Sequence, residues 1–190
     1  MDFAAIRARL GARRPRRVED AKAASAAVAL ILAPGTPGDP AILFIRRAEH
    51  PDDPWSGQIG LPGGRRDGGD TDEAGTAVRE TLEETGIGLE AGALLGQLDD
   101  LHPLSPALPP VVVRPFVYGL DRRPEIRPSR EVAGHFWAPL SALRAGAGRA
   151  RVDIRGETSE VRAYLVGTSV IWGMTHRIIE GFLSALEEAR

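Results

Sequence analysis

Three glutamates with helical spacing are the residues of this chain best suited to do chemistry. Glu80, Glu83 and Glu84 stand at i, i+3 and i+4, so a helix would project them together from one side. Like charges placed in this way repel one another, and the helix dipole disfavours anions in a last turn by about 0.3–1 kcal/mol each. A bound divalent cation would reverse both penalties. The pattern therefore indicates a carboxylate site suited to holding a divalent cation against phosphate oxygens.

Local signals define the helix that must carry these glutamates. Asp70 and Glu73 form a capping-box start, and Gly86 is a typical glycine stop after the last helical residue. A glycine-rich turn, residues 61–64, precedes the helix. One further set of residues recurs at helical spacing and is predicted to pack on a core: Ala74, Ala77, Val78, Thr81 and Leu82.

An acidic helix face has a simpler explanation that must be weighed. Solvated helix surfaces often carry glutamates, and Arg79 would offset Glu83 at i+4. The glycine-rich turn before the helix and the glycine stop after it favour the cation site instead.

The turn and the helix together resemble the Nudix box, the loop–helix–loop motif of the Nudix hydrolase superfamily. The matching residues are Gly64 and the Arg-Glu-x-x-Glu-Glu-x-Gly run of residues 79–86. In that family these glutamates bind Mg²⁺ or Mn²⁺ and help to activate water for attack on a diphosphate linked to another moiety. The resemblance implies this catalytic and metal-binding role for Glu80, Glu83 and Glu84. It also implies that Arg79 orients a glutamate and that the Gly64 carbonyl is a further metal ligand.

The motif departs from the usual Nudix pattern at three points. The segment from Gly64 to Arg79 is one residue longer than usual, Asp70 replaces the first glutamate of the box, and Thr81 stands where an aliphatic residue is more common. None of these changes alters the i, i+3, i+4 spacing of the glutamates, so we expect the metal site to be retained.

The longer loop and its aspartate are similar to the coenzyme A pyrophosphatase branch of the family. Residues 42–47, 57–64 and the Ile-Trp-Gly-Met-Thr run at 171–175 also resemble that branch, and the likeness extends over about residues 25–185. Asp53, in an enlarged loop at 52–56, stands where the branch usually has a basic residue. The resemblance implies hydrolysis of coenzyme A or acyl-coenzyme A to (acyl-)4′-phosphopantetheine and adenosine 3′,5′-bisphosphate.

Two other functions stay open from the sequence. The enzyme could act on ADP-ribose, dinucleoside polyphosphates or oxidised nucleotides, and Asp53 is the residue that leaves this open. A domain that senses a nucleotide without cleaving it is the alternative of another class, although the glutamates of the box are all present. A calcium loop at Asp67, Asp70 and Asp72 is excluded, because the glycine and the terminal glutamate are not at EF-hand positions.

Residues outside the box are further candidates for the site. Glu131 precedes an apolar strand, where many Nudix relatives have another glutamate near the metals, and could act as a ligand or as the general base. Arginine forks suit phosphate oxygens. We therefore predict that Arg46, Arg65 and Arg66 bind substrate together with Gly63 of the turn. Trp55 could stack on a base, and the proline-rich loop at 103–110 is expected to border the substrate.

Composition narrows the class of protein. The chain has 190 residues, a formal net charge of -2 and a pI near 6.1, so no basic field suggests a nucleic-acid polymer as partner. It contains no cysteine, which excludes disulfide and thiolate chemistry and fits a cytoplasmic protein. No apolar run is long enough to span a membrane. The expected partner is a small nucleotide-diphosphate substrate, and the resemblance allows a homodimer.

The pattern of elements predicts an α/β (α+β) protein. Strands are expected at 25–33 and 41–47 around a Pro/Gly turn, then at 94–101, 111–120 and 132–138, with a hairpin at 152–165 and a closing helix at 169–189. Phe3, Ile6 and Leu10 predict a packed N-terminal helix. We divide the chain into an N-terminal helical extension, residues 1–24, and a hydrolase domain, 25–190. The family resemblance specifies an α/β/α sandwich with a mixed β-sheet between helices.

Overall fold

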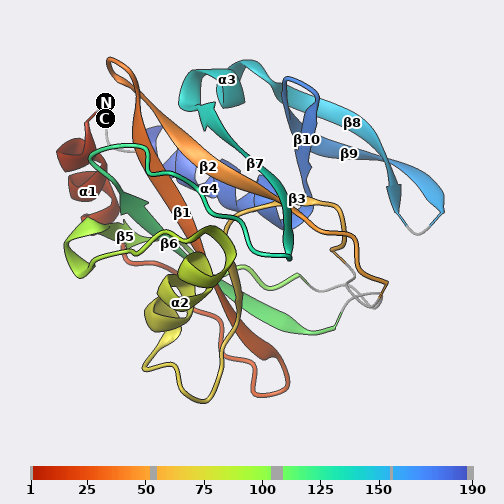
Figure 1. The fold of residues 1–190 in the computed structure, drawn as a ribbon, viewed down its shortest axis with the longest axis horizontal. Helices are drawn as coiled ribbons and strands as arrows, with labels where there is room; N and C mark the ends of the chain where they lie inside the picture. Colours follow the sequence, from red (N-terminus) through yellow and green to blue (C-terminus); the bar gives the residue numbers. More distant parts are fainter. Residues whose placement is uncertain (1, 52–54, 104–108, 155, 188–190) are drawn as a thin grey trace.

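A mixed β-sheet lies at the centre of the computed structural model, which describes residues 2–51, 55–103, 109–154 and 156–187 (Figure 1). The helices are α1 (Phe3–Gly11), α2 (Glu73–Thr85), α3 (Leu140–Ala145) and α4 (Gly173–Glu187), with a short 3₁₀ turn η1 (Ala91–Ala93). The strands are β1 (Ala24–Thr36), β2 (Asp39–Arg47), β3 (Ile59–Gly60), β4 (Gly63–Arg65), β5 (Leu94–Gln97), β6 (Val111–Gly119), β7 (Val132–Pro139), β8 (Ala147–Ile154), β9 (Glu157–Val166) and β10 (Ser169–Trp172).

The central sheet opens between its two longest strands. β1 and β2 pair directly only near the turn that joins them, from Leu32 with Ile42 to Thr36 with Asp39. Farther along, β4 pairs with β1 and β3 pairs with β2, so the β3–β4 segment occupies the space between the diverging strands. β6 runs parallel to β1, β5 pairs with β6, and β7 pairs with β2. The predicted mixed sheet is confirmed.

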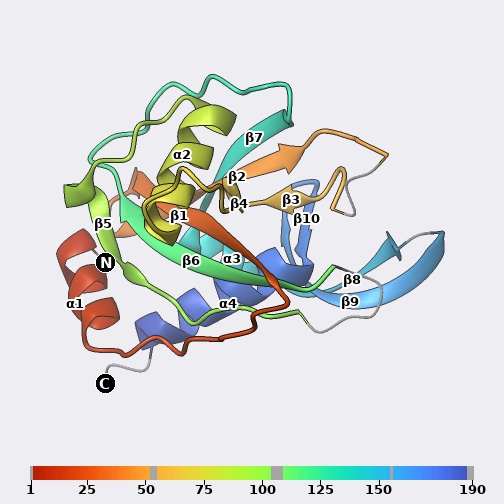
Figure 2. The ribbon, with the colours of Figure 1, turned by 90° about the horizontal axis from the view of Figure 1, so that it is seen from below.

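Both faces of the sheet are covered, because β1 has apolar residues on both of its sides. Leu30 and Leu32 belong to one core cluster with residues of α1 and α4, whereas Ala29 and Ile31 belong to a second cluster with Ala77 of α2. Alternate residues of a strand point to opposite faces, which explains this division. Figure 2 shows α2 on one side of the sheet and α1 and α4 on the other. The predicted layering of helices around a mixed sheet is therefore confirmed.

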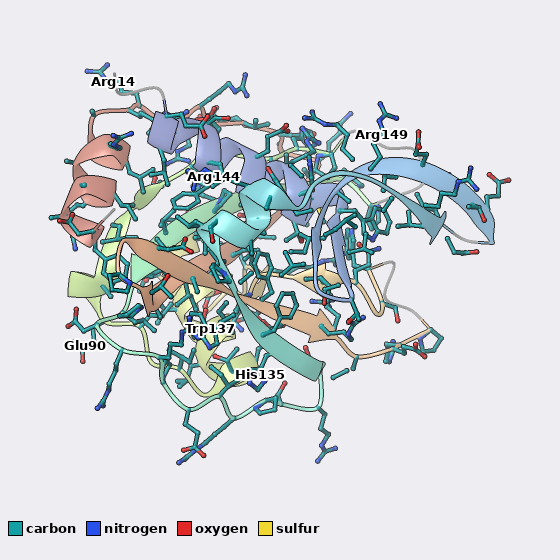
Figure 3. All side chains as sticks on the ribbon, turned by 90° about the horizontal axis from the view of Figure 1, so that it is seen from above. Arg14, Glu90, His135, Trp137, Arg144 and Arg149 are labelled. Carbon is teal, nitrogen blue, oxygen red and sulfur yellow. The ribbon has the colours of Figure 1, made fainter. Side chains whose placement is uncertain are left out.

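A second, three-stranded sheet lies beside the first and consists of β8, β9 and β10. The predicted hairpin is confirmed and is longer than expected, with Gly156 at φ 85° in its turn. Figure 3 shows Arg149 on this hairpin, which projects from the body of the molecule. The prediction of one helix over 169–189 is wrong at its start. Residues 169–172 form β10, and Gly173, at φ 65°, marks the change from strand to helix.

Other boundaries also differ from the prediction. β1 continues through the Pro/Gly segment to Thr36, so the turn is narrower than expected and contains Gly38 at φ 79°. β5 ends at Gln97 instead of Leu101, although Leu101 still makes an isolated bridge with Val113. Among the described residues, no helix has the length and apolar character needed to cross a membrane.

The N-terminal helix is confirmed and packs against the rest of the fold. Asp2 caps it by accepting a hydrogen bond from the Ala5 N–H at 2.8 Å. Ile6 and Leu10 are buried in the core cluster that includes α4. After the helix, the backbone N–H of Arg16 donates to Asp99 at 3.0 Å. The N-terminal segment is thus held both by apolar packing and by polar contacts.

Asp100 makes the main polar contact of this segment. Its buried carboxylate accepts hydrogen bonds from the Arg17 side chain at 2.8 Å, the Val18 N–H at 3.1 Å and two nitrogens of Arg114 at 3.0 Å. Burial alone would raise the pKa of Asp100, but these hydrogen bonds outweigh it and hold the pKa below its ordinary value. Arg114 also contacts Glu73, the first residue of α2, at 3.0 Å. One arginine therefore joins the N-terminal segment to the start of the acidic helix.

We expect Asp100→Ala to lower the free energy of unfolding by about 3 kcal/mol, because it removes one side of a buried ion pair. The matched control is Glu160→Ala, which breaks the exposed Arg149–Glu160 pair at 2.9 Å and should cost less than about 1 kcal/mol. Urea denaturation of both variants measures the difference. Equal effects of the two substitutions would contradict a structural role for Asp100.

Candidate active site

The N-cap of the acidic helix α2 lies two residues later than predicted. Asp72, not Asp70, is the N-cap, and its carboxylate accepts a hydrogen bond from the Gly75 N–H at 2.8 Å. The prediction failed because Asp70 has other partners, described below. The predicted stop is confirmed: Gly86 has φ 73°, and its N–H donates to the Leu82 carbonyl at 2.9 Å.

The buried face of α2 also differs from the predicted one. Leu82 is 53% exposed, so its assignment to the core is wrong. Thr81 and Thr85 are fully buried, and their hydroxyls donate to helix carbonyls at 2.7 and 2.6 Å. The Thr85 hydroxyl also accepts a hydrogen bond from the Ile87 N–H at 3.2 Å. Glu84 is only 3% exposed. The three glutamates therefore do not share one solvated face.

Glu84 lies where the helix meets the glycine-rich turn. Its Oε2 accepts a hydrogen bond from the Gly63 N–H at 2.9 Å, and its Oε1 lies 3.8 Å from the Arg47 guanidinium. Burial is the main cause that raises the pKa of Glu84 to about 7, and the negative charges of Glu80 and Glu131 act in the same direction. The Gly63 hydrogen bond and the positive charge of Arg47 oppose this rise. The structure has thus placed a carboxylate where it is costly to ionise without a nearby cation.

Two glycines allow β4 to fit between β1 and α2. Gly63 has φ 151°, and a Cβ there would lie 2.3 Å from the Ala27 carbonyl oxygen. A Cβ on Gly64 would lie 2.5–2.7 Å from the carboxylate atoms of Glu80. A side chain at Gly64 would therefore occupy the space of the Glu80 carboxylate.

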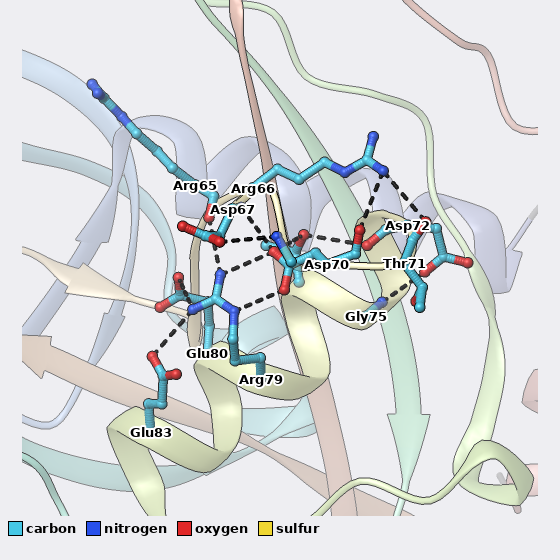
Figure 4. A network of polar contacts seen from close by, with 12 residues as sticks. Arg65, Arg66, Asp67, Asp70, Thr71, Asp72, Gly75, Arg79, Glu80 and Glu83 are labelled. Carbon is cyan, nitrogen blue, oxygen red and sulfur yellow. Dashed lines mark hydrogen bonds and ion pairs between the residues drawn. The ribbon is translucent and has the colours of Figure 1, made fainter.

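Arg79 sits at the centre of a polar network that positions the glutamates (Figure 4). Its Nε and Nη2 donate to the two oxygens of Asp70 at 2.8 and 3.0 Å, and Nη1 donates to Glu80 at 2.9 Å and to Glu83 at 3.1 Å. A further bond to the Arg65 carbonyl, at 3.2 Å, fixes the guanidinium against the turn. Hydrogen bonding to Arg79 lowers the pKa of Asp70, and the same bond raises the pKa of Arg79.

Asp70 therefore anchors Arg79 instead of capping the helix. It also accepts hydrogen bonds from the Asp67 N–H at 2.9 Å and from the Thr76 hydroxyl at 2.8 Å. These bonds fold the loop before α2 so that it holds the arginine from the side opposite Glu80.

A cavity of about 540 Å³ opens beside the carboxylates. Glu80, Glu84 and Glu131 all line it, and Glu131 lies just before β7 as predicted. Burial raises the pKa of Glu80, and repulsion from Glu83 and Glu131 acts in the same direction. The side chain of Glu83 is 58% exposed and does not line the cavity.

The carboxylates do not form a closed metal cage. Within the part of the chain that the structure describes, no three or more His, Cys, Asp or Glu side chains gather closely enough to hold a metal ion. The physical reason lies in their protein partners, because Arg79 bonds both Glu80 and Glu83 and Gly63 bonds Glu84. Metal ligation by the three glutamates and the Gly64 carbonyl stays a prediction.

The basic residues predicted to bind substrate have different positions. Arg65 and Gly63 line the cavity. Arg66 is outside the lining and donates to the carbonyls of Asp70 and Thr71 at 3.5 and 3.3 Å. Arg46 is exposed on β2 and is also outside the lining.

Sequence reasoning missed Arg47, which does line the cavity. Neighbouring strand residues point to opposite faces of a sheet, so Arg47, four residues after Leu43, is expected on the same face as Leu43. Leu43 packs in the core cluster that includes Ala77 of α2. This alternation along the strand was the available signal. Trp55 lines the cavity, whereas residues 52–54 of its loop and residues 104–108 of the predicted specificity loop lie outside the described part of the chain.

The split mixed sheet, with an acidic helix against a two-glycine turn, agrees with the Nudix resemblance of the sequence. A family model described as NUDIX domain matches residues 22–155, well over half of the chain. The chain therefore belongs to the Nudix family of hydrolases.

Two curated relatives agree with this assignment. A Yersinia pestis protein named uncharacterized Nudix hydrolase NudL is 33% identical over 148 residues, which are 74% of this chain and 70% of that protein. The Schizosaccharomyces pombe uncharacterized protein C14C4.10c is 35% identical over 130 residues, 66% of this chain. The chain covers only 40% of the length of the S. pombe protein.

Solved structures share the fold at low sequence identity. A MutT/nudix family protein from Enterococcus faecalis has a TM-score of 0.61 at 16% identity, covering 98% of this chain and 70% of that one. A NUDIX hydrolase from Alicyclobacillus acidocaldarius has a TM-score of 0.60 at 17% identity, covering 88% and 93%. The NUDIX domain of Shewanella oneidensis NrtR, solved with ADP ribose, has a TM-score of 0.53 at 20% identity, covering 73% and 86%.

We expect Glu84→Gln to stabilise the metal-free protein more at pH 8 than at pH 5. Between the ordinary pKa of 4.5 and the folded value of about 7, the folded state keeps a proton that the unfolded state has lost, so wild-type stability falls as pH rises. Glutamine does not titrate, and the gain at pH 8 relative to pH 5 should be about 2 kcal/mol. Urea denaturation in EDTA measures it, with the exposed Glu90→Gln as control. An identical effect of Glu84→Gln at both pH values would refute the burial cost assigned to this carboxylate.

Proposed function

We propose that this chain hydrolyses a nucleoside diphosphate linked to another moiety with the help of Mg²⁺ or Mn²⁺, and that its substrate is coenzyme A or acyl-coenzyme A. The observation that carries the proposal is the group of mutually repelling carboxylates, Glu80, Glu84 and Glu131, on the wall of one cavity. Arg47 and Arg65 line the same cavity. Such an arrangement suits a cation and an anionic substrate bound together.

The donor set fits a hard divalent cation. Carboxylate oxygens are its preferred ligands, and the raised pKa values of Glu80 and Glu84 reflect a charge that a cation would neutralise. Gly64 exposes its backbone beside Glu80 because it has no Cβ. Glu80, Glu84 and the Gly64 carbonyl would hold the ion, with Glu83 nearby on the same helix. Bound there, the ion would neutralise diphosphate charge and lower the pKa of a water molecule.

The other residues position and polarise the reactants. The Asp70–Arg79 pair fixes the orientation of Glu80, and the Gly63 N–H fixes that of Glu84. Arg47 and Arg65 can pair with phosphate oxygens. Glu131 is the candidate general base, because it borders the cavity and its carbonyl accepts a hydrogen bond at 2.8 Å from the N–H of Ala48, the residue after β2.

In the proposed reaction, a water oxygen forms a bond to one phosphorus of the diphosphate, and the bond from that phosphorus to the bridging oxygen breaks. The other phosphate leaves with its organic group, and the water proton passes to Glu131. Catalysis would be mainly electrostatic and positional, as expected for phosphoryl transfer. From coenzyme A, the products would be 4′-phosphopantetheine and adenosine 3′,5′-bisphosphate.

The segments that resemble the coenzyme A pyrophosphatase branch meet at this cavity, which supports the choice of substrate. Gln58, Ile59 and Gly60 of the 57–64 segment line one part of the wall, and Met174 and Thr175 of the 171–175 segment line another. The Thr175 hydroxyl donates to the Ile59 carbonyl at 3.0 Å and so joins the two segments. Residues far apart in the sequence thus contribute to one substrate-facing surface.

A substrate panel tests the proposal. The purified protein is incubated with Mg²⁺ or Mn²⁺ and with coenzyme A, acyl-coenzyme A, ADP-ribose, dinucleoside polyphosphates and oxidised nucleotides, and the products are identified by mass spectrometry. Selective release of adenosine 3′,5′-bisphosphate supports coenzyme A. Preference for another diphosphate would overturn that substrate alone, and binding without turnover would favour the sensor function. The expected homodimer and cytoplasmic location stay predictions.

Glu84→Gln should lower the metal-dependent kcat by about 10²-fold or more while retaining the fold, because the amide keeps the size of the side chain but loses its charge. Activity on the best substrate of the panel and circular dichroism measure the two effects. Glu90→Gln is the control for removal of a glutamate charge elsewhere. Full activity of Glu84→Gln would contradict the proposed mechanism.

Gly64→Ala should lower kcat by at least about tenfold, because its Cβ would displace the Glu80 carboxylate and a small misplacement of a catalytic group is costly. Gly68→Ala, in the loop before α2, meets no atom within 4 Å and should stay within about twofold of wild type. Steady-state kinetics compares the two variants. Similar rates for both would argue against a positioning role for the Glu80–Gly64 contact.

A further inference from the structure

The cavity has two chemically unlike sides. One side carries the carboxylates of Glu80, Glu84 and Glu131. The other side consists of apolar residues that belong to the core cluster between the sheet and α4. A substrate that fills the cavity must therefore contact charged groups and apolar core residues at the same time.

The apolar side is built from three elements that are distant in the sequence. β6 contributes Val111 and Val113, β3 contributes Ile59, and the first turns of α4 contribute Met174 and Ile178. All but Met174 are buried, and Met174 packs against the same cluster. We call these five residues the aliphatic wall. Since they come from regular elements packed in a core, the wall has a fixed shape.

The hydroxyl of Thr175, next to the aliphatic wall, already has a hydrogen-bond partner inside the protein. Thr175 stands between Met174 and Ile178, and its hydroxyl donates to the Ile59 carbonyl. A ligand group rich in hydroxyls would lose its hydrogen bonds to water on entering this side, and the side chains of the aliphatic wall offer nothing to replace them. A hydrocarbon group would lose nothing and would gain from leaving water.

Trp55 also lines the cavity, but the five residues of the aliphatic wall itself suit an aliphatic group. Its members are branched aliphatic side chains and one flexible methionine, which adapt to a chain of methylenes. A cavity of about 540 Å³ falls within the range of small-molecule sites and has room for a diphosphate together with such a chain.

We propose that the aliphatic wall binds a hydrocarbon segment of one organic arm of the substrate, so that this chain selects diphosphate esters with an aliphatic arm over those whose arm offers only sugar hydroxyls. The inference rests on the proposed function, which places the diphosphate at the carboxylates. It adds a rule for the substrate that the carboxylates cannot supply, because they interact with the diphosphate alone.

The test uses a series of adenosine diphosphate β-alkyl esters, from ethyl to hexyl, with ADP-ribose as the hydroxyl-rich comparison. We expect kcat/KM to rise by about threefold per added methylene until the cavity is filled, and ADP-ribose to fall below the ethyl ester. Calorimetric titration of the same esters in EDTA measures affinity without requiring turnover. The affinity should rise with chain length in the same order.

Two variants connect the effect to the wall. Met174→Ser should reduce the gain per methylene to less than about twofold, because it replaces part of the hydrocarbon surface with a hydroxyl. Leu165→Ser is the matched control, since Leu165 is an exposed leucine on β9 outside the cavity lining. It should keep the wild-type dependence on chain length.

The outcomes separate this inference from the proposed function. If no ester is hydrolysed but affinity rises with chain length, the aliphatic wall is supported and the proposed hydrolysis fails. If the esters are hydrolysed at rates independent of chain length, or if ADP-ribose is preferred, the wall proposal is overturned and the hydrolysis stands. An unchanged chain-length dependence in Met174→Ser would also overturn it.

Discussion

The burial of the Glu84 carboxylate in the opening of the central sheet is the constraint on which the rest of the site depends. β4 must run close to α2 so that the Gly63 N–H can reach this carboxylate. A Cβ at position 63 would meet the Ala27 carbonyl of β1, and a Cβ at position 64 would meet the Glu80 carboxylate of α2, so β4 fits between them with glycine at both positions. The alanines of β1 and the buried threonines of α2 bring helix and sheet together without leaving polar groups unsatisfied. The fold thus accepts a costly charge at the place where a cation would compensate for it.

The remaining glutamates are controlled by a second set of contacts outside the cavity. Arg79 is held by Asp70 and in turn holds Glu80 and Glu83, so the loop before the helix determines where these carboxylates lie. Glu84 is held differently, by its burial and by the hydrogen bond from the Gly63 N–H. The site therefore combines one carboxylate positioned by packing with another positioned by an ion-pair network.

Periodicity and glycine signals were sufficient for the architecture but not for the details of the site. The mixed sheet, the acidic helix, its glycine stop and the position of Glu131 follow from local patterns that tertiary contacts reinforce. Asp70 was misassigned because an aspartate can cap a helix or bind an arginine, and the choice depends on where Arg79 lies. Leu82 is exposed and Glu84 is buried, contrary to expectation, because the side of α2 that faces β4 carries Glu84, which bonds the Gly63 N–H there. Arg47 was overlooked because its alternation with Arg46 along the strand, which places it on the side of Leu43, was not used to choose between the two arginines.

The parallel pairing of β1 with β6 has a consequence for how the chain folds. These strands adjoin along most of their length but are separated in sequence by β2, β3, β4, α2 and β5. Contacts between such distant segments form slowly, because the entropy of closing the intervening loop is lost before the contacts form. The wall of the cavity next to β1 includes β6, so the binding surface is completed only after this late closure. During synthesis, the acidic helix would therefore leave the ribosome well before the surface that is to receive its substrate exists.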